Sequence, residues 1–309
     1  MKILLTTTSF QDTPGKHQDL LNQTGFKIDR LRGPLQESAL LPIIANYSGI
    51  ICGDDEITKN VIRKGAEGKL KIISKYGVGL DNVDLKAAQQ FNIPVTNCEG
   101  VNHITVAEHF FALLLAFYKN ICKEYEFIKG QSWKRLTGRE IFEKKLGIIG
   151  LGKIGKEIAK RAKAFGLEVY AHDLYFDEAF LKEYAIIKCS TMIEVLQTSD
   201  IVSLNLPLTY ETKNLISMDT IKNHFKKNSL LVNTSRAGLV ELEAIIYGLE
   251  NRILSGYLTD VLEEEPMKPN HPLLKFENVL ITPHIGSRTY ESVQRQGMMA
   301  VQNLLNHLK

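Results

Sequence analysis

The chain has 309 residues, which is long enough for two domains of ordinary size. Hydrophobic residues make up 44% and charged residues 24%, the profile of a soluble globular protein. The net charge of +3 is too small to indicate binding to nucleic acid or to a membrane surface, and no apolar run approaches the length of a transmembrane helix.

The N-terminus, MKILLTTTSF, has one lysine followed by a short strand-like segment. It lacks the apolar region and the small-residue cleavage site of a signal peptide, so we expect a cytoplasmic protein. The four cysteines are scattered along the chain without the spacing of metal ligands: Cys52, Cys98, Cys122 and Cys189. We therefore expect reduced, mostly packed thiols and no metal site.

Strand and helix candidates alternate in the first hundred residues. The strand candidates lie at residues 2–7, 26–31, 48–53, 71–77 and 93–98, and the clearest helix candidate between them at 84–91. Residues 104–128 follow, and their length and apolar richness predict one long helix that is buried on most of its surface. This helix could cross between two domains, and its apolar face could also pack against a second subunit.

A glycine-rich turn, GIIGLGKIG, joins a short apolar strand to a helix at residues 147–155, and a second strand ends in Asp173. Gly150 permits a tight exit from the strand, Gly152 lets a pyrophosphate approach the backbone, and Gly155 lets the helix pack close to the sheet. The start of the helix offers free N–H groups to phosphates. Asp173 lies where an acid binds the adenosine ribose and repels a 2′-phosphate, so this segment predicts NAD rather than NADP.

The second part of the chain continues the alternation. Strand candidates lie at residues 146–150, 167–173, 185–190, 200–207, 229–235, 256–261 and 278–284. Residues 287–309 read as a C-terminal helix that could return to the first part, with a core-facing set at Val293, Met298, Val301, Leu304 and Leu305. The predicted fold class is therefore α/β, with two doubly wound parallel sheets of the Rossmann and flavodoxin-like type.

Three chemically active side chains follow strands of the second part, where ligands of open α/β sheets bind. These are Arg236, Glu265 and His284. The arginine can bind a carboxylate and polarise a carbonyl, and the histidine can exchange a proton with the substrate oxygen. A paired carboxylate would orient the imidazole and favour the protonated form that reduction requires. Together they predict hydride transfer to or from a 2-oxo or 2-hydroxy acid.

The motifs KYGVGLDNVDL, VAEH, GIIGLGKIG, NTSRAGLV, DVLEEEP and TPHIG occur in one order and spacing over nearly the whole chain. In this the chain resembles the D-isomer-specific 2-hydroxyacid dehydrogenase family and, within it, the phosphoglycerate dehydrogenase branch of serine biosynthesis. The resemblance implies a substrate domain of residues 1–100 completed by 285–309, and an NAD-binding Rossmann domain of residues 101–284. It also implies an active-site cleft between them and a homodimer.

The resemblance also implies roles for single residues. Arg236 would bind substrate, His284 would be the acid/base, and Glu265, which directly precedes a proline, would be its carboxylate partner. Cofactor contacts would come from the glycine turn and from Lys153, Ile154, Asp173, Pro207, Thr234, Ser235 and Asp260, the last of which would bind the nicotinamide carboxamide. Substrate contacts would come from Lys75, Tyr76, Gly77 and Val78, whose backbone amides would take the carboxylate, and from Asn102.

Some positions depart from the family pattern and leave the substrate open. Asn205 stands where many relatives have histidine, Ala237 replaces a glycine, and Lys75 stands where many phosphoglycerate dehydrogenases have arginine. We expect 3-phosphoglycerate as the substrate, with Lys75 near its phosphate and Arg135 and Arg288 as further candidates. The alternatives are a glyoxylate or hydroxypyruvate reductase and an NAD-sensing corepressor-like protein. Because no regulatory domain follows the last helix, we also expect no inhibition by serine.

Overall fold

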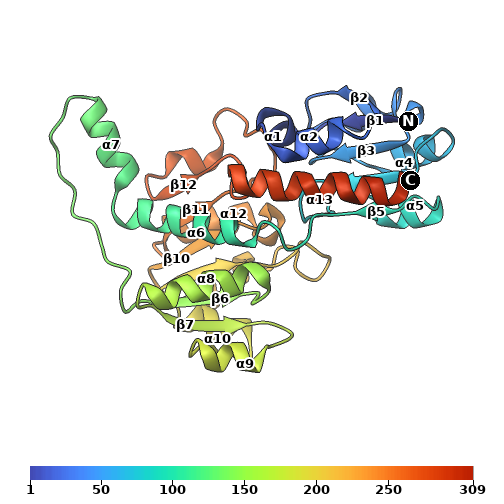
Figure 1. Ribbon diagram of the computed structural model, residues 1–309. Helices are drawn as coiled ribbons and strands as arrows, with labels where there is room; N and C mark the ends of the chain where they lie inside the picture. Colours follow the sequence, from blue (N-terminus) through green and yellow to red (C-terminus); the bar gives the residue numbers. More distant parts are fainter. Residues whose placement is uncertain (309) are drawn as a thin grey trace. The chain divides into compact units, whose positions relative to one another are not determined.

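A computed structural model describes residues 1–308 of the chain (Figure 1). Its internal contacts divide the chain into two compact units. The first unit comprises residues 1–102 together with the segment from Ser287 to the end of the described chain, and the second comprises residues 103–286. The chain therefore passes from one unit to the other twice, after Asn102 and after Gly286.

The first unit contains a five-stranded parallel sheet in the order β2-β1-β3-β4-β5, the flavodoxin-like arrangement. Its strands are β1 (Lys2–Leu5), β2 (Lys27–Arg30), β3 (Gly49–Cys52), β4 (Ile72–Lys75) and β5 (Val95–Thr96). Its helices are α1 (Thr8–Asp12), α2 (Lys16–Asn22), α3 (Glu37–Leu40), α4 (Lys59–Ala66), α5 (Leu85–Gln90) and α13 (Tyr290–Leu308), with a 3₁₀ turn η1 (Ile44–Asn46).

The second unit contains a seven-stranded parallel sheet in the order β12-β11-β10-β9-β6-β7-β8. Its strands are β6 (Lys145–Ile149), β7 (Glu168–His172), β8 (Ile187–Lys188), β9 (Ile201–Leu204), β10 (Ser229–Asn233), β11 (Leu254–Thr259) and β12 (Val279–Ile281). Its helices are α6 (His103–Tyr118), α7 (Ile121–Lys129), α8 (Lys153–Ala164), α9 (Glu178–Glu183), α10 (Met192–Thr198), α11 (Met218–His224) and α12 (Leu242–Glu250), with 3₁₀ turns η2 (Ala237–Leu239) and η3 (Pro272–Lys275).

The twelve strands lie where the alternating pattern predicts them, and the fold class is confirmed. Both sheets are fully parallel, so helices cover both faces and most inner strands are continuous apolar runs. The edge strands β2 and β8 are instead partly polar and exposed or half-buried. Several covering helices begin at a short polar residue whose side chain accepts a hydrogen bond from a free N–H of the first turn. These capping residues are Thr58, Asp84, Asp177, Thr191 and Ser217.

The C-terminal helix α13 belongs to the first unit and covers one face of its sheet, so that the red helix and the blue strands of Figure 1 share one core. Buried side chains of α13 (Val293, Ala300, Val301, Leu304 and Leu308) pack with Ile3, Leu5, Ile51 and Ile72 of the sheet. Full burial of one such large aliphatic side chain is worth about 1.5–3 kcal/mol. Of the predicted core-facing set, Met298 is half-buried outside this cluster, and Met299 packs against it instead.

The prediction of one long helix over residues 104–128 is wrong. The segment forms two helices, α6 and α7, that meet at a bend of 62°. Asn120 lies at the break in the left-handed conformation with φ +56°, which asparagine tolerates better than most residues. The core of the second unit covers much of α6, but no residue of α7 is buried, and in Figure 1 α7 projects away from the sheet.

Within residues 1–308, no single helix is both long and apolar enough to cross a membrane. Only the bent pair α6–α7, taken together, meets the length and composition expected of a span.

Candidate active site

Most of the predicted site residues of the second unit follow directly on the carboxyl ends of its strands. Gly150 follows β6, Asp173 follows β7, and Asp260 follows β11. The strand order reverses between β6 and β9, and the crevice at such a switch point is where open α/β sheets bind ligands. The sheet therefore gathers these residues at one edge.

The glycine turn has the geometry that the sequence predicts for it. Gly150 has φ +94°, and a Cβ there would lie 2.5 Å from the carbonyl oxygen of Asn205. A Cβ at Gly155 would lie 2.2 Å from the carbonyl oxygen of Gly150, so α8 packs against the turn only because this residue is glycine. A Cβ at Gly152 would meet nothing within 4 Å. This open space above the start of α8 fits the approach of a pyrophosphate.

Asp173 lies beside the same turn and holds its backbone. One carboxylate oxygen accepts a hydrogen bond of 2.6 Å from the amide of Leu151, and the other accepts one of 3.1 Å from the amide of Tyr175. A carboxylate has about four lone-pair positions, so acceptor capacity remains for a ribose diol. Ile154, the second residue of α8, packs its half-buried side chain against the core of the second unit.

The segment after β10 offers a further polar atom to a ligand. The hydroxyl of Thr234 is buried and has no hydrogen-bond partner within the described chain, which fits the polar end of a nicotinamide. Ser235 turns its hydroxyl to the carbonyl oxygen of Leu204 at 2.8 Å and so joins the ends of β10 and β9. Pro207, after β9, lies at the exposed rim and accepts a hydrogen bond from Thr212. With the glycine turn and Asp173, these residues fit NAD.

The structure brings His284 and Glu265 together. Nδ1 of the imidazole lies 2.8 Å from Oε2 of the glutamate, and Oε1 of the same glutamate accepts the amide of Leu262 at 3.0 Å. The histidine backbone has φ +53°, a left-handed conformation that few non-glycine residues adopt. Its own amide donates to the carbonyl oxygen of Thr282 at 3.0 Å. This arrangement fixes the ring through Nδ1 and through its backbone.

Arg236 stands two residues beyond Thr234, after β10. Its guanidinium donates to the carbonyl oxygen of Ser235 at 2.8 Å, and its own carbonyl oxygen accepts from the side-chain amide of Asn233 at 2.9 Å. Asn233 is fully buried, so the backbone that carries the arginine is anchored in the sheet.

Asp260 is almost completely buried at the end of β11 and makes contacts that the sequence analysis did not predict. It accepts hydrogen bonds from the hydroxyl of Thr282 at 2.6 Å and from the amides of Ile285 at 2.9 Å and Gly286 at 2.7 Å. Burial alone would raise the pKa of Asp260, but hydrogen bonds from His109, Thr282 and Ile285 hold that pKa below its ordinary value. The histidine of the VAEH motif, His109, is the sequence feature that could have indicated these contacts.

In the first unit, the predicted substrate loop follows β4. The amide of Tyr76 is already used, since it donates to the carbonyl oxygen of Cys52 at 2.8 Å. The amides of Gly77 and Val78 make no hydrogen bond within residues 1–308, so these two remain for a substrate carboxylate. Gly77 has φ +119°, which only glycine adopts with ease. Asn102 is the last residue of the first unit before α6.

Lys75 is the last residue of β4 and is buried. It is 4% exposed, and its ammonium donates to the carboxylate of Asp54 at 2.7 Å and to the carbonyl oxygen of Gly53. These contacts join the ends of β3 and β4. The ammonium group that the sequence predicts near a substrate phosphate is therefore already paired with a carboxylate inside the first unit.

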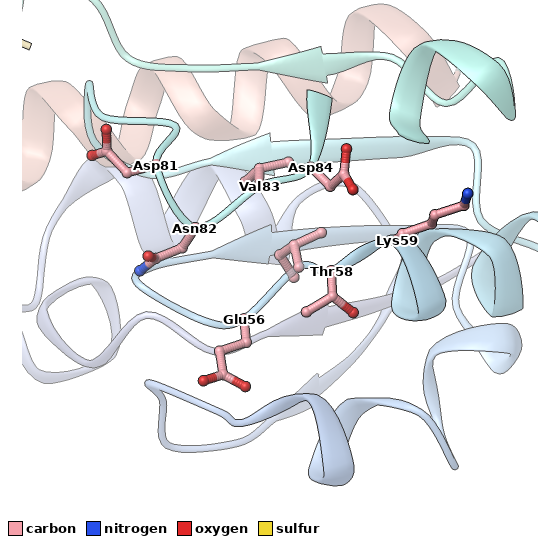
Figure 2. A pocket seen from close by; sticks show the side chains of 8 residues that line it. Glu56, Thr58, Lys59, Asp81, Asn82, Val83 and Asp84 are labelled. Atoms are coloured by element: carbon pink, nitrogen blue, oxygen red, sulfur yellow. The ribbon is translucent and has the colours of Figure 1, made fainter. Parts of the chain in front are cut away.

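The first unit also has an open hollow of about 380 Å³, formed by the segments after β3 and β4. Figure 2 shows the carboxylates of Glu56, Asp81 and Asp84 around it, together with Lys59. None of the predicted site residues lines this hollow. Because its carboxylates would repel an anionic 2-oxo acid, we do not place the reaction there.

Comparison with known proteins gives consistent results. Residues 111–286 match the family model described as D-isomer specific 2-hydroxyacid dehydrogenase, NAD binding domain. A glyoxylate reductase of Korarchaeum cryptofilum is 37% identical over 78% of this chain and 74% of its own length. A D-3-phosphoglycerate dehydrogenase of Methanocaldococcus jannaschii is 33% identical over 100% of this chain but only 58% of its own length.

One solved structure is similar over the full length of the chain. The crystal structure of the TT0316 protein from Thermus thermophilus superposes with a TM-score of 0.89 at 34% identity, covering 100% of this chain and 97% of that chain.

Proposed function

Because the chain belongs to the D-isomer-specific 2-hydroxyacid dehydrogenase family, we propose that it oxidises D-3-phosphoglycerate to 3-phosphohydroxypyruvate, a step of serine biosynthesis. The family makes it an NAD-dependent oxidoreductase of D-2-hydroxy acids. The phosphorylated substrate is the part that we propose. The observation that carries the chemistry is the 2.8 Å contact between His284 and Glu265, in the unit that holds the dinucleotide turn.

When bound, NAD supplies the hydride acceptor or, as NADH, the hydride donor. In the direction of reduction, Arg236 would bind the substrate carboxylate and draw electron density from the carbonyl oxygen. His284 would give the Nε2 proton to that oxygen as the hydride reaches the carbon, so that the 2-oxo group becomes a hydroxyl. Glu265 would hold the ring at Nδ1 and stabilise its positive charge.

The phosphate of the substrate requires a cation near the site. The contacts of Lys75 with Asp54 leave Arg288 as the better candidate. This arginine is 43% exposed and contacts Asp12 at 3.2 Å, but Arg32 already pairs with the same carboxylate through two nitrogens. Two guanidinium groups thus share one carboxylate and leave a net positive charge. Arg288 is four residues beyond His284, so their Cα atoms lie within about 14 Å of each other however the chain runs.

Glyoxylate or hydroxypyruvate reduction is the second candidate. It is favoured by relatives named glyoxylate reductase at up to 37% identity and by the engagement of Lys75 within the first unit. A corepressor-like protein is the alternative from another class, and it would bind NADH tightly with negligible turnover.

The test is NADH oxidation with phosphohydroxypyruvate, hydroxypyruvate and glyoxylate. We expect the highest kcat/KM for phosphohydroxypyruvate. Arg288→Ala should lower that value about 10- to 100-fold, as the loss of a charge-assisted hydrogen bond predicts, and leave hydroxypyruvate nearly unchanged. Lys75→Ala is the matched comparison, and a phosphate-specific loss in that variant would return the role to Lys75. A native preference for glyoxylate or hydroxypyruvate would select the second candidate.

We also propose a homodimer and a cytoplasmic location. The support for the dimer is α7, on which Ile121, Tyr125 and Ile128 are each more than half exposed. These three residues share one side of the helix, because they are spaced four and three positions apart. An apolar strip of this kind on a projecting helix is suited to contact with a second copy.

A further inference from the structure

The contacts of Asp260 form part of a longer chain of hydrogen bonds that begins on α6. His109 of α6 is largely buried, and its Nε2 lies 2.9 Å from the hydroxyl oxygen of Thr282 and 3.3 Å from Oδ1 of Asp260. The hydroxyl of Thr282 lies 2.6 Å from the same carboxylate oxygen. Three side chains, one from α6 and two from the residues directly after β11 and β12, thus meet inside the second unit.

The direction of each hydrogen bond follows from the chemistry of the groups. An ionised carboxylate can only accept, so the hydroxyl of Thr282 donates its single proton to Asp260. The hydroxyl oxygen of Thr282 then has only acceptor positions left for His109. Nε2 of His109 therefore carries a proton and donates it toward Thr282 and Asp260.

The far end of this chain of bonds is the backbone next to His284. The amide of Ile285 donates to Oδ1 of Asp260, and the amide of Gly286 donates to Oδ2. These are the two residues directly after the left-handed His284. Gly286 fits tightly, because a Cβ there would lie 2.8 Å from Oδ2 of Asp260 and 3.4 Å from Cδ2 of His109.

Resting on the proposed function, we propose that His109 and Thr282 are positioning residues for the reaction. They fix the carboxylate of Asp260, which accepts hydrogen bonds from the amides of Ile285 and Gly286. These two amides in turn hold His284 in its left-handed conformation, in which its ring faces Glu265. An unsupported non-glycine residue would leave that conformation for a commoner one. The ring would then lose its alignment even though no catalytic atom had been changed.

Two pairs of variants test this. Thr282→Val removes the hydroxyl and keeps the shape, whereas Thr282→Ser keeps the hydroxyl. His109→Leu removes the donor, whereas His109→Gln keeps an N–H donor near the position of Nε2. For each variant, kcat, the KM for the 2-oxo acid, the Kd for NADH and the amide hydrogen exchange of residues 284–288 in the ligand-free protein would be measured.

We expect Thr282→Val and His109→Leu to lower kcat at least 10-fold while the Kd for NADH changes less than about threefold. Amide exchange in residues 284–288 should become faster in both. Thr282→Ser and His109→Gln should stay within about threefold of the native kcat and keep their protection. The Kd readout matters because Asp260 is also predicted to bind the nicotinamide carboxamide, and a loss through that route would weaken NADH binding instead.

The proposal would be overturned if Thr282→Val and Thr282→Ser, or His109→Leu and His109→Gln, lowered kcat equally. An unchanged kcat in all four variants would also overturn it. If His109→Leu does not fold, the threonine pair decides by itself. If the native protein reduces no 2-oxo acid, the proposed function fails. The exchange measurements would still show whether His109 and Thr282 hold this backbone.

Discussion

The contact between Nδ1 of His284 and Oε2 of Glu265 places a negative charge beside the ring that is proposed to carry the proton. His284→Ala should leave NADH affinity nearly intact and lower kcat by about 10²–10⁴, the usual loss for a general acid/base.

Glu265→Gln should move the alkaline limb of the pH–rate profile for reduction to lower pH, because the protonated ring loses a stabilising charge. An unchanged profile in Glu265→Gln would contradict the pairing.

Asp173 holds the glycine turn and is predicted to bind the adenosine ribose, and substitution can separate the two roles. Asp173→Asn keeps an oxygen that can accept the amide of Leu151 but removes the charge that would repel a 2′-phosphate. We expect it to narrow the preference for NADH over NADPH with little loss of stability. Asp173→Ala should narrow the preference and also weaken NADH binding, measured by fluorescence titration. Better use of NADPH than of NADH by the native protein would refute this assignment.

For single residues, the sequence predicts best those features that depend on neighbours close by in the chain. The turn at Gly150, Gly152 and Gly155 has its predicted geometry because its requirements lie within a few residues. The environment of Lys75 could not be predicted in the same way, since its partner Asp54 lies 21 positions earlier and meets it only when β3 pairs with β4. The contact between Asp260 and His109 joins two elements that are even farther apart in the chain.

At the scale of elements, strands are predicted more accurately than the break between α6 and α7. A buried parallel strand carries a continuous apolar run between polar loops, and this run identifies most strands of both sheets. The two-residue strands β5 and β8, which are half-buried and exposed respectively, also lie within predicted segments. The break depends on two polar residues, Lys119 and Asn120, inside an otherwise apolar stretch. Two residues scarcely change the apolar average of a 25-residue window, but one left-handed residue is enough to end a helix.

The exposed strip on α7 predicts the oligomeric state. Ile121→Lys combined with Ile128→Lys should shift the protein toward monomer in sedimentation velocity. The melting temperature of the monomer should change little, because neither side chain is buried within the chain. Glu126→Lys places a lysine on another side of the same helix and should leave the dimer intact. A native protein that sediments as a monomer at micromolar concentration would rule out the homodimer.

Over the whole molecule, the four thiols should differ sharply in reactivity. Burial raises the pKa of Cys52 to about 12 and that of Cys98 to about 11, and it also raises the pKa of Cys189. A buried thiol that stays protonated at neutral pH reacts slowly. Cys122 is the exposed thiol. We expect one thiol per chain to react rapidly with a chromogenic disulfide reagent at pH 8, and Cys122→Ser to abolish that fast phase.

The position of α13 has a consequence for the order in which a growing chain can fold. Residues 103–286 are contiguous, so the second unit has its whole sequence as soon as it leaves the ribosome. The first unit begins earlier but must wait for α13, which covers Ile3, Leu5 and Ile51. Domains usually complete in order from the N-terminus during synthesis, and here that order is reversed. A ribosome-stalled nascent chain ending before α13 should therefore protect the second unit from protease and leave the first open to cleavage.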